Sequence, residues 1–237
     1  MNLHGAETWD WLSTSPLLGV TLTVGGYVLG RWLHARTSSP VFQPVLVAMV
    51  VIVTFLELTD VSYAEFMVGG SYISFWLGAA TVALALPLHQ EWHLVRRAAL
   101  PVLLGVVAGT LVSVVCAIWV TDLAGGSREL QLTMAPKAAT TPVSLALSTQ
   151  IGGIPALTAA LTILAGITGA ILGPWVLDRI GVTDQRARGI AMGSVTHGIG
   201  TARALQESRT EGAFSALCMG LAAVATSVAV PLLILVL

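Results

Sequence analysis

The residues best suited to bind an anion lie between two prolines, Pro136 and Pro142. Lys137 is the only lysine of the chain, and two adjacent hydroxyl residues, Thr140 and Thr141, follow it. Threonine is a common residue just before a helix, and proline is tolerated in a first turn, so we expect a helix to begin here. A helix N-terminus offers free backbone N–H groups and the positive end of the helix dipole. Together with the ammonium and hydroxyl groups, it predicts an anion-binding site.

The position of Lys137 in the chain supports this hypothesis, because residues 138–177 contain no charged side chain. An unpaired cation deep in a bilayer costs at least about 2.5–3.5 kcal/mol, so it is expected to face a cavity or a partner. The alternative is that Lys137 extends from a loop to the membrane surface. The sequence leaves both open.

A second group of polar residues occupies 193–203. On a continuous helix, Ser194, His197 and Thr201 would share one face. Gly198 and Gly200 each weaken a helix by about 1 kcal/mol, which fits a place where the helix unwinds or approaches another group closely. His197 titrates near neutral pH and could accept a coupled proton. The alternative is a histidine that only hydrogen-bonds a neighbouring helix.

A matching half-site is expected near Gly78 and Thr81, where the backbone would break again, although a threonine packed between helices is an equal alternative. The sequence has no nucleophile-elbow pattern and no conventional metal-ligand spacing. We therefore expect no enzyme activity, no metal and no cofactor. No carboxylate lies in the middle of an apolar run, so no candidate for a carboxylate-based sodium or proton site is evident.

The composition predicts the elements that hold these residues. Of 237 residues, 55% are hydrophobic and 10% charged, and the mean hydropathy is +0.85. Soluble domains contain about 25% charged residues, so the chain is expected to be an all-α, polytopic membrane protein in a lipid bilayer. A net charge of −1 gives no support for nucleic-acid binding. Cys116 and Cys218 are expected to pack as small hydrophobic residues.

The apolar runs predict about seven or eight membrane helices. Arg31 and Arg36 follow the first run, which places the N-terminus outside by the positive-inside rule. One crossing per run would then put the arginines of 178–188 outside, against that rule. A broken or re-entrant segment near 136–150 removes the conflict and makes two repeats, about 16–121 and 128–237, inverted. Inverted repeats with two broken helices are typical of secondary transporters.

Several motifs, in the same order, resemble the LrgB/CidB family of antiholin-like bacterial membrane proteins, which is related to the plastidial glycolate/glycerate translocator. The resemblance extends from about Pro16 to the C-terminus, and two departures from it are Gln43 and Ala79, where asparagine and proline are expected. The matching segments are 71–78, Lys137 with 140–142, 197–202 and 211–215.

The resemblance implies one LrgB-like transmembrane domain over residues 1–237 with an elevator-transporter-like fold. It also implies transport of small monocarboxylates such as glycolate, glycerate or pyruvate across the bacterial inner membrane. A smaller LrgA-type membrane partner and a homo-oligomer are expected. The alternative function is antiholin-like regulation of murein hydrolase export and cell lysis, without transport turnover.

Overall fold

The computed structural model describes residues 11–37, 42–83 and 85–236, without the side chains of Leu77, Gly78, Ala80, Thr81 and Val236. In these ranges every regular element is a helix, which confirms the all-α prediction. Contacts divide the chain into two compact units, residues 1–83 and 84–237.

In the described part of the first unit the long helices are α2 (Pro16–Thr37), α3 (Pro44–Thr59) and α4 (Tyr63–Ala83). Helix α2 packs against both of the others, and a methyl group added at Gly19 would overlap the backbone of α4. The Oε1 atom of Gln43 accepts hydrogen bonds from Val45 N at 3.0 Å and Leu46 N at 3.2 Å. Glutamine therefore caps α3 in the role expected of asparagine.

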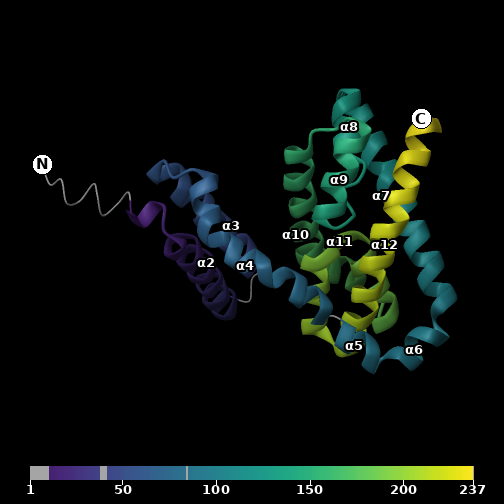
Figure 1. Cartoon of the computed structure of the whole chain (residues 1–237). Coiled ribbons are helices and arrows are strands. Elements are labelled where there is room, and N and C mark those ends of the chain that lie inside the picture. The colour runs from purple at the N-terminus through teal and green to yellow at the C-terminus, as the bar shows by residue number, and fades with distance from the viewer. Residues whose placement is uncertain (1–10, 38–41, 84, 237) are drawn as a thin grey trace, which may run out of the picture. The chain divides into compact units, whose positions relative to one another are not determined.

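The second unit contains the other helices of the described residues, and four of these helices are long (Figure 1). The long helices α7, α10 and α12 enclose a broken helix, α11. Figure 1 shows α8 and the C-terminal end of α12 at one end of this unit, and α5 and α6 at the other. The bounds are α5 (Ala85–Gln90), α6 (Trp92–Arg97), α7 (Ala99–Leu123), α8 (Arg128–Met134), α9 (Thr141–Ile151), α10 (Pro155–Arg179), α11 (Gln185–Glu207) and α12 (Arg209–Val236).

Three helices of the described ranges are long and apolar enough to cross a membrane: α7, α10 and α12. Helix α3 is apolar but has only 16 residues. The three candidate spans of the described residues are fewer than the seven or eight membrane helices expected. The number expected included the broken segment near 136–150, where α9 has only 11 residues, and the polar segment of 189–206, where α11 is interrupted.

Helices α7 and α12 run side by side in the same direction. Near their starts, Val102 of α7 and Phe214 of α12 share one hydrophobic cluster. Near their ends, Ile118 and Val230 share another. Both helices therefore begin at one end of the unit and finish at the other end.

Helices α8 and α9 form a hairpin that starts and finishes at the end of the unit where α7 and α12 finish. Arg128, at the start of α8, donates a hydrogen bond at 3.4 Å to the carbonyl of Ile234. Ile151, at the end of α9, packs against the cluster that Ala135 forms with residues of the second halves of α7 and α12. The chain enters the unit and returns to the same end, with its turn at residues 135–140. The prolines predicted an interruption in this place.

Helix α11 is a second hairpin, which enters from the opposite end. A methyl group at Gly189 would contact Glu211 and one at Gly212 would contact Leu205, so both halves of α11 lie beside the start of α12. In a straight helix, residues 189 and 205 would be about 24 Å apart. The chain therefore reverses within α11, at His197, whose φ of 42° and ψ of −140° are not helical.

The second interruption is not where the sequence analysis placed it. We expected it near Gly78, but α4 is helical from Tyr63 to Ala83. The residue after Gly78 is Ala79 rather than proline, and a lone glycine removes no helical hydrogen bond. The two interruptions described here both fall in the range expected for the second repeat, 128–237. The repeat boundaries themselves stay a prediction.

Candidate functional site

The tips of the two hairpins meet at a hollow of about 450 Å³ in the second unit. One hairpin contributes residues just before and within its turn, and the other contributes the two residues before its reversal at His197. Helices α7 and α10 complete the wall. The lining residues are Ser113, Met134, Lys137, Leu161, Leu164, Ala165, Thr168, Gly169, Val195 and Thr196.

Lys137 is the charged residue of this wall. Among the described residues, no carboxylate lies within ion-pair distance of its ammonium group. A half-buried cation beside a hollow, without an anionic partner in the described chain, is suited to an anionic ligand.

The turn that presents Lys137 is held by a serine from α9. Ser144 is fully buried, and its Oγ atom lies 2.7 Å from the carbonyl oxygen of Pro136 and 3.1 Å from that of Ala139. Thr140 is the residue before α9, and its side chain makes no capping hydrogen bond. Thr141 and Pro142 form the first turn of α9, as expected. Neither threonine is among the residues that line the hollow.

Buried hydroxyl groups fasten this hairpin to α10. Thr133 Oγ1 accepts a hydrogen bond at 2.9 Å from the backbone N–H of Ile154, at the start of α10. Thr158 Oγ1 lies 3.0 Å from the carbonyl oxygen of Thr133 and 2.7 Å from Ser148 Oγ. Hydrogen bonds between helices contribute about 0.6 kcal/mol each on average in membrane proteins. Several together fix the position of the turn.

The second tip is fixed through the side chain of His197. Its Nε2 atom lies 2.9 Å from the carbonyl oxygen of Thr162 in α10, and the ring is buried. Gly166 lies directly beneath the ring, where a methyl group would overlap it. His197 therefore anchors the hairpin to α10, while its neighbour Thr196 reaches the hollow.

The common helix face expected for Ser194, His197 and Thr201 does not exist, because the chain reverses at His197. Ser194 is buried and donates to the carbonyl of Ile190 at 2.7 Å. Thr201 donates to the carbonyl of His197 at 2.8 Å and lies 2.9 Å from Ser215 Oγ. These two side chains stabilise the reversal rather than line the hollow. Gly198 directly follows His197 and Gly200 comes two residues later, in the stretch where unwinding was expected.

Thr81 belongs to the first unit, and its side chain lies outside the described residues. Three polar residues of the hollow were missed instead: Ser113, Thr168 and Thr196. Ser113 and Thr168 lie within apolar runs that gave no polar pattern. Thr196 is adjacent to His197, but helical spacing put it on the other face.

The chain is similar to known proteins over most of its length. The sequence profile of the LrgB-like family matches residues 23–236. The chain is 35% identical to the uncharacterized protein YxaC of Bacillus subtilis over 91% of this chain and 94% of the relative. It is 32% identical to the holin-like protein CidB of Staphylococcus epidermidis, covering 92% and 96% of the two chains. It is 31% identical to the antiholin-like protein LrgB of Bacillus mycoides, covering 92% and 95%. No solved structure matches.

Proposed function

The chain belongs to the LrgB-like family, and on this basis we propose that it is a secondary transporter of small monocarboxylates of the glycolate, glycerate and pyruvate class. The observation behind the proposal is the hollow between the two hairpin tips, with Lys137 in its wall. Its volume of about 450 Å³ is at the small end of the range of ligand pockets.

The wall suits the chemistry of a short carboxylate. The ammonium of Lys137 offers charge-assisted hydrogen bonds to the carboxylate oxygens. Thr168 and Ser113 can donate to or accept from a substrate hydroxyl, or donate to a keto oxygen, whereas Thr196 donates to the carbonyl of Met192 and can accept from a substrate hydroxyl. Leu161, Leu164 and Ala165 provide an apolar surface for the carbon chain. The positive end of the α9 dipole, four residues after Lys137, would also favour an anion, but Thr140 and Thr141 at that end are not among the residues that line the hollow.

Two hairpins that enter from opposite ends fit alternating access. Irregular backbone at membrane depth is tolerated where it is packed in protein or lines a cavity, and both turns meet that condition. The substrate would bind at the tips and reach either side by movement of the hairpins or of the whole unit. We also propose the bacterial cell membrane as the location, an LrgA-type membrane protein as partner and a homo-oligomeric assembly.

The second candidate is an antiholin-like regulator of murein hydrolase export and cell lysis, without turnover. The names of two relatives, holin-like CidB and antiholin-like LrgB, favour it. It predicts oligomeric pores, whose flux does not saturate and is not reduced by a competing substrate. A carrier predicts both saturation and competition.

Counterflow separates the two candidates. Proteoliposomes are loaded with unlabelled glycolate or pyruvate, and uptake of the labelled compound is measured with and without an LrgA-type partner. A carrier accumulates label transiently, because exchange does not require net flux. Absence of accumulation in both preparations, together with unsaturable leak, would reject the carrier and support the regulator.

A further inference from the structure

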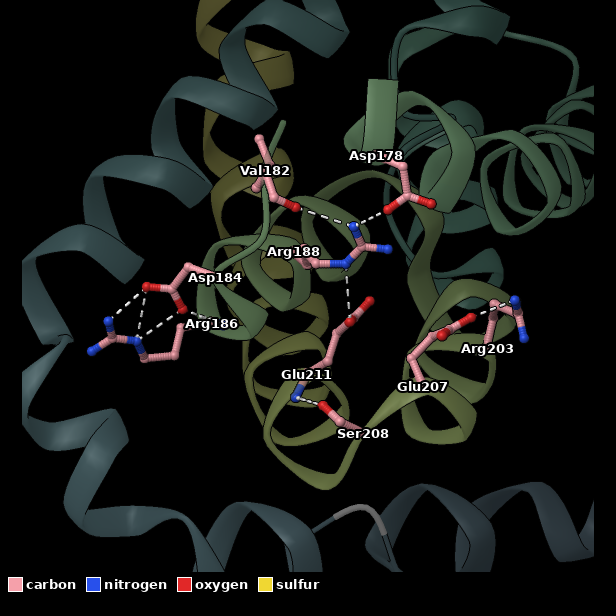
Figure 2. Close-up of polar contacts among 9 residues, drawn as sticks. All are labelled: Asp178, Val182, Asp184, Arg186, Arg188, Arg203, Glu207, Ser208 and Glu211. Carbon is pink, nitrogen blue, oxygen red and sulfur yellow. Dashed lines mark hydrogen bonds and ion pairs between the residues drawn. The ribbon is translucent and has the colours of Figure 1, made fainter. Parts of the chain in front are cut away.

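One carboxylate is buried at the end of the second unit where α12 begins. The side chain of Glu211 is only 2% exposed. Its Oε2 atom lies 3.3 Å from Nε of Arg188 in α11 (Figure 2). Its Oε1 atom is also buried and has no hydrogen-bond partner among the described residues. A bare carboxylate oxygen away from water is costly unless it takes up a proton or a partner.

The local sequence would normally use this carboxylate for another purpose. Ser208 and Glu211 have the spacing of a capping box, in which the acidic side chain accepts from the backbone N–H of the first residue. The chain contains a complete example at the start of α4: Ser62 N donates to Glu65 Oε2 at 2.7 Å, and Glu65 N donates to Ser62 Oγ at 3.2 Å.

At α12 only half of the box forms. Glu211 N donates to Ser208 Oγ at 3.0 Å, but the backbone N–H of Ser208 bonds to the carbonyl of Ala204 instead. Figure 2 shows the side chain of Glu211 directed toward Arg188. Helix capping therefore does not explain why an acidic side chain is buried here.

Arg188 does not depend on Glu211 for its hydrogen bonds. Its NH1 atom lies 2.6 Å from Asp178 Oδ1 and donates to the carbonyl of Val182 at 3.1 Å. Asp178 is 68% exposed and Arg188 is 11% exposed, so the network runs from water to the buried Glu211. If Glu211 loses its charge, Arg188 keeps an anionic partner, and no second charge is stranded.

The other charged groups that act on Glu211 also lie on α11. Arg203 favours its charged form and Glu207 opposes it, but these two form an ion pair with each other. Helix α10 contributes Asp178, which bonds to Arg188. The described parts of α5, α7 and α9, which also pack against α12, give no charged group that acts on Glu211.

We propose that Glu211 is a proton-binding site, at which the charged carboxylate pairs with Arg188 and the neutral acid releases it. The proton comes from hydronium in the adjacent water and forms an O–H bond on Oε1, leaving a water molecule. Arg188 stays protonated and keeps its bonds to Asp178 and Val182.

Helix α11 connects this site to the hollow. Arg188 lies in its first half, and Val195 and Thr196 of the hollow follow on the same half. Gly189 and Gly193 bring this half against the backbone of α12, as in the small-residue contacts of membrane helices. Release of Arg188 would loosen this half of the hairpin. That this couples protons to transport rests on the proposed carrier function, whereas the protonation itself does not.

Infrared difference spectra of the protein in lipid nanodiscs test the protonation. We expect a carboxylic acid C=O band to appear as the pH is lowered, to be lost in Glu211→Gln and to persist in Glu207→Gln. Glu207 is the matched control because it is 35% exposed and lies four residues before Glu211, at the end of α11. If Glu211→Gln does not fold, Glu211→Asp is used, and the band is expected to shift in frequency. An identical titrating band in either Glu211 variant, or none in the wild type, would overturn the proposal.

Proteoliposomes with an imposed pH gradient test the coupling. We expect the gradient to stimulate uptake of glycolate or pyruvate by the wild type and by Glu207→Gln, and the stimulation to be lost in Glu211→Gln. Retained stimulation in Glu211→Gln would overturn the coupling. A wild type without counterflow would instead reject the carrier function, while the infrared band still decides whether Glu211 binds a proton.

Discussion

The Nε2 atom of His197 lies 2.9 Å from the carbonyl oxygen of Thr162, and this contact joins the tip of the α11 hairpin to the middle of α10. The ring fits there because residue 166, one turn further along α10, is a glycine. The position of Thr196 in the hollow thus depends on one buried imidazole and the absence of one methyl group.

A methyl group at Gly166 is therefore expected to displace this tip. Overpacking a tight contact costs about 1–3 kcal/mol, and we expect Gly166→Ala to lower the free energy of unfolding by that amount. Gly220→Ala is the control, because nothing lies within 4 Å of the added atom. Denaturant unfolding in mixed micelles measures both. Equal stability of the two variants would show that the ring and Gly166 are not in contact.

The backbone of His197 gives a second prediction. Its positive φ of 42° is a conformation that favours glycine and costs other residues about 1–3 kcal/mol. His197→Ala and His197→Gly both remove the hydrogen bond to Thr162, but only glycine relieves the strain. We expect the glycine variant to be more stable than the alanine variant, the reverse of the order in a regular helix. Denaturant unfolding of the two variants tests this order. If the alanine variant is the more stable of the two, as in a regular helix, the result would argue against a reversal at this residue.

The third prediction concerns Lys137, because we propose that its ammonium group binds the substrate carboxylate. Hydrogen bonds to charged groups contribute about 1.5–3 kcal/mol, so Lys137→Ala should reduce glycolate or pyruvate uptake by about tenfold or more. Lys137→Arg keeps the charge and should retain part of the activity. Arg186→Ala, which removes an exposed cation paired with Asp184, should leave uptake unchanged. Wild-type uptake by Lys137→Ala would exclude this residue from the binding site.

The helices and the first interruption could be predicted because their signals are local. Residues 155–179 are long and apolar, and Pro136 and Pro142 limit helix formation wherever they occur. The reversal at His197 was less accessible. Its glycines suggested unwinding. However, the prediction that Ser194 and Thr201 share a face used the periodicity of a straight helix, and the chain does not form that helix.

The burial of Glu211 could not be predicted from the sequence, for a different reason. It lies at the edge of an apolar run, where an exposed helix-capping role is the ordinary interpretation, so no carboxylate site was expected. Its burial results from Arg188, 23 residues earlier in the chain, and from the close approach of α11 at Gly189. Tertiary packing of this kind has no signature in local spacing.

The ion pair at the start of α11 predicts a pH dependence outside the membrane helices. Hydrogen bonds from Arg186 lower the pKa of Asp184 from 3.8 to about 2. A lowered pKa means that the pair stabilises the fold above about pH 3.8 and that this contribution is lost as the pH falls toward 2. We expect Arg186→Ala to return the pKa of Asp184 toward 3.8, as measured by carboxyl NMR. An unchanged pKa would contradict the pairing. Asp184 is also not expected to contribute to titrations near neutral pH.

The last prediction concerns the sidedness of the arginine-bearing loops. Val95 and Ala98, which flank Arg96 and Arg97, belong to the same cluster as Phe214 near the start of α12. The loop between α10 and α11 lies at that end too, because Arg188 contacts Glu211. The positive-inside rule therefore places both loops in the cytoplasm.

Single cysteines in a background without Cys116 and Cys218 test this sidedness with a membrane-impermeant thiol reagent. Thr183→Cys and His93→Cys should be protected in intact cells and labelled in inverted vesicles. Ala124→Cys, after the end of α7, should show the opposite pattern. Thr183 and His93 can lie on the same side because the α8–α9 hairpin enters and leaves at one end and adds no membrane crossing between α7 and α10. Labelling of Thr183→Cys and His93→Cys from opposite sides would mean that the hairpin spans the membrane.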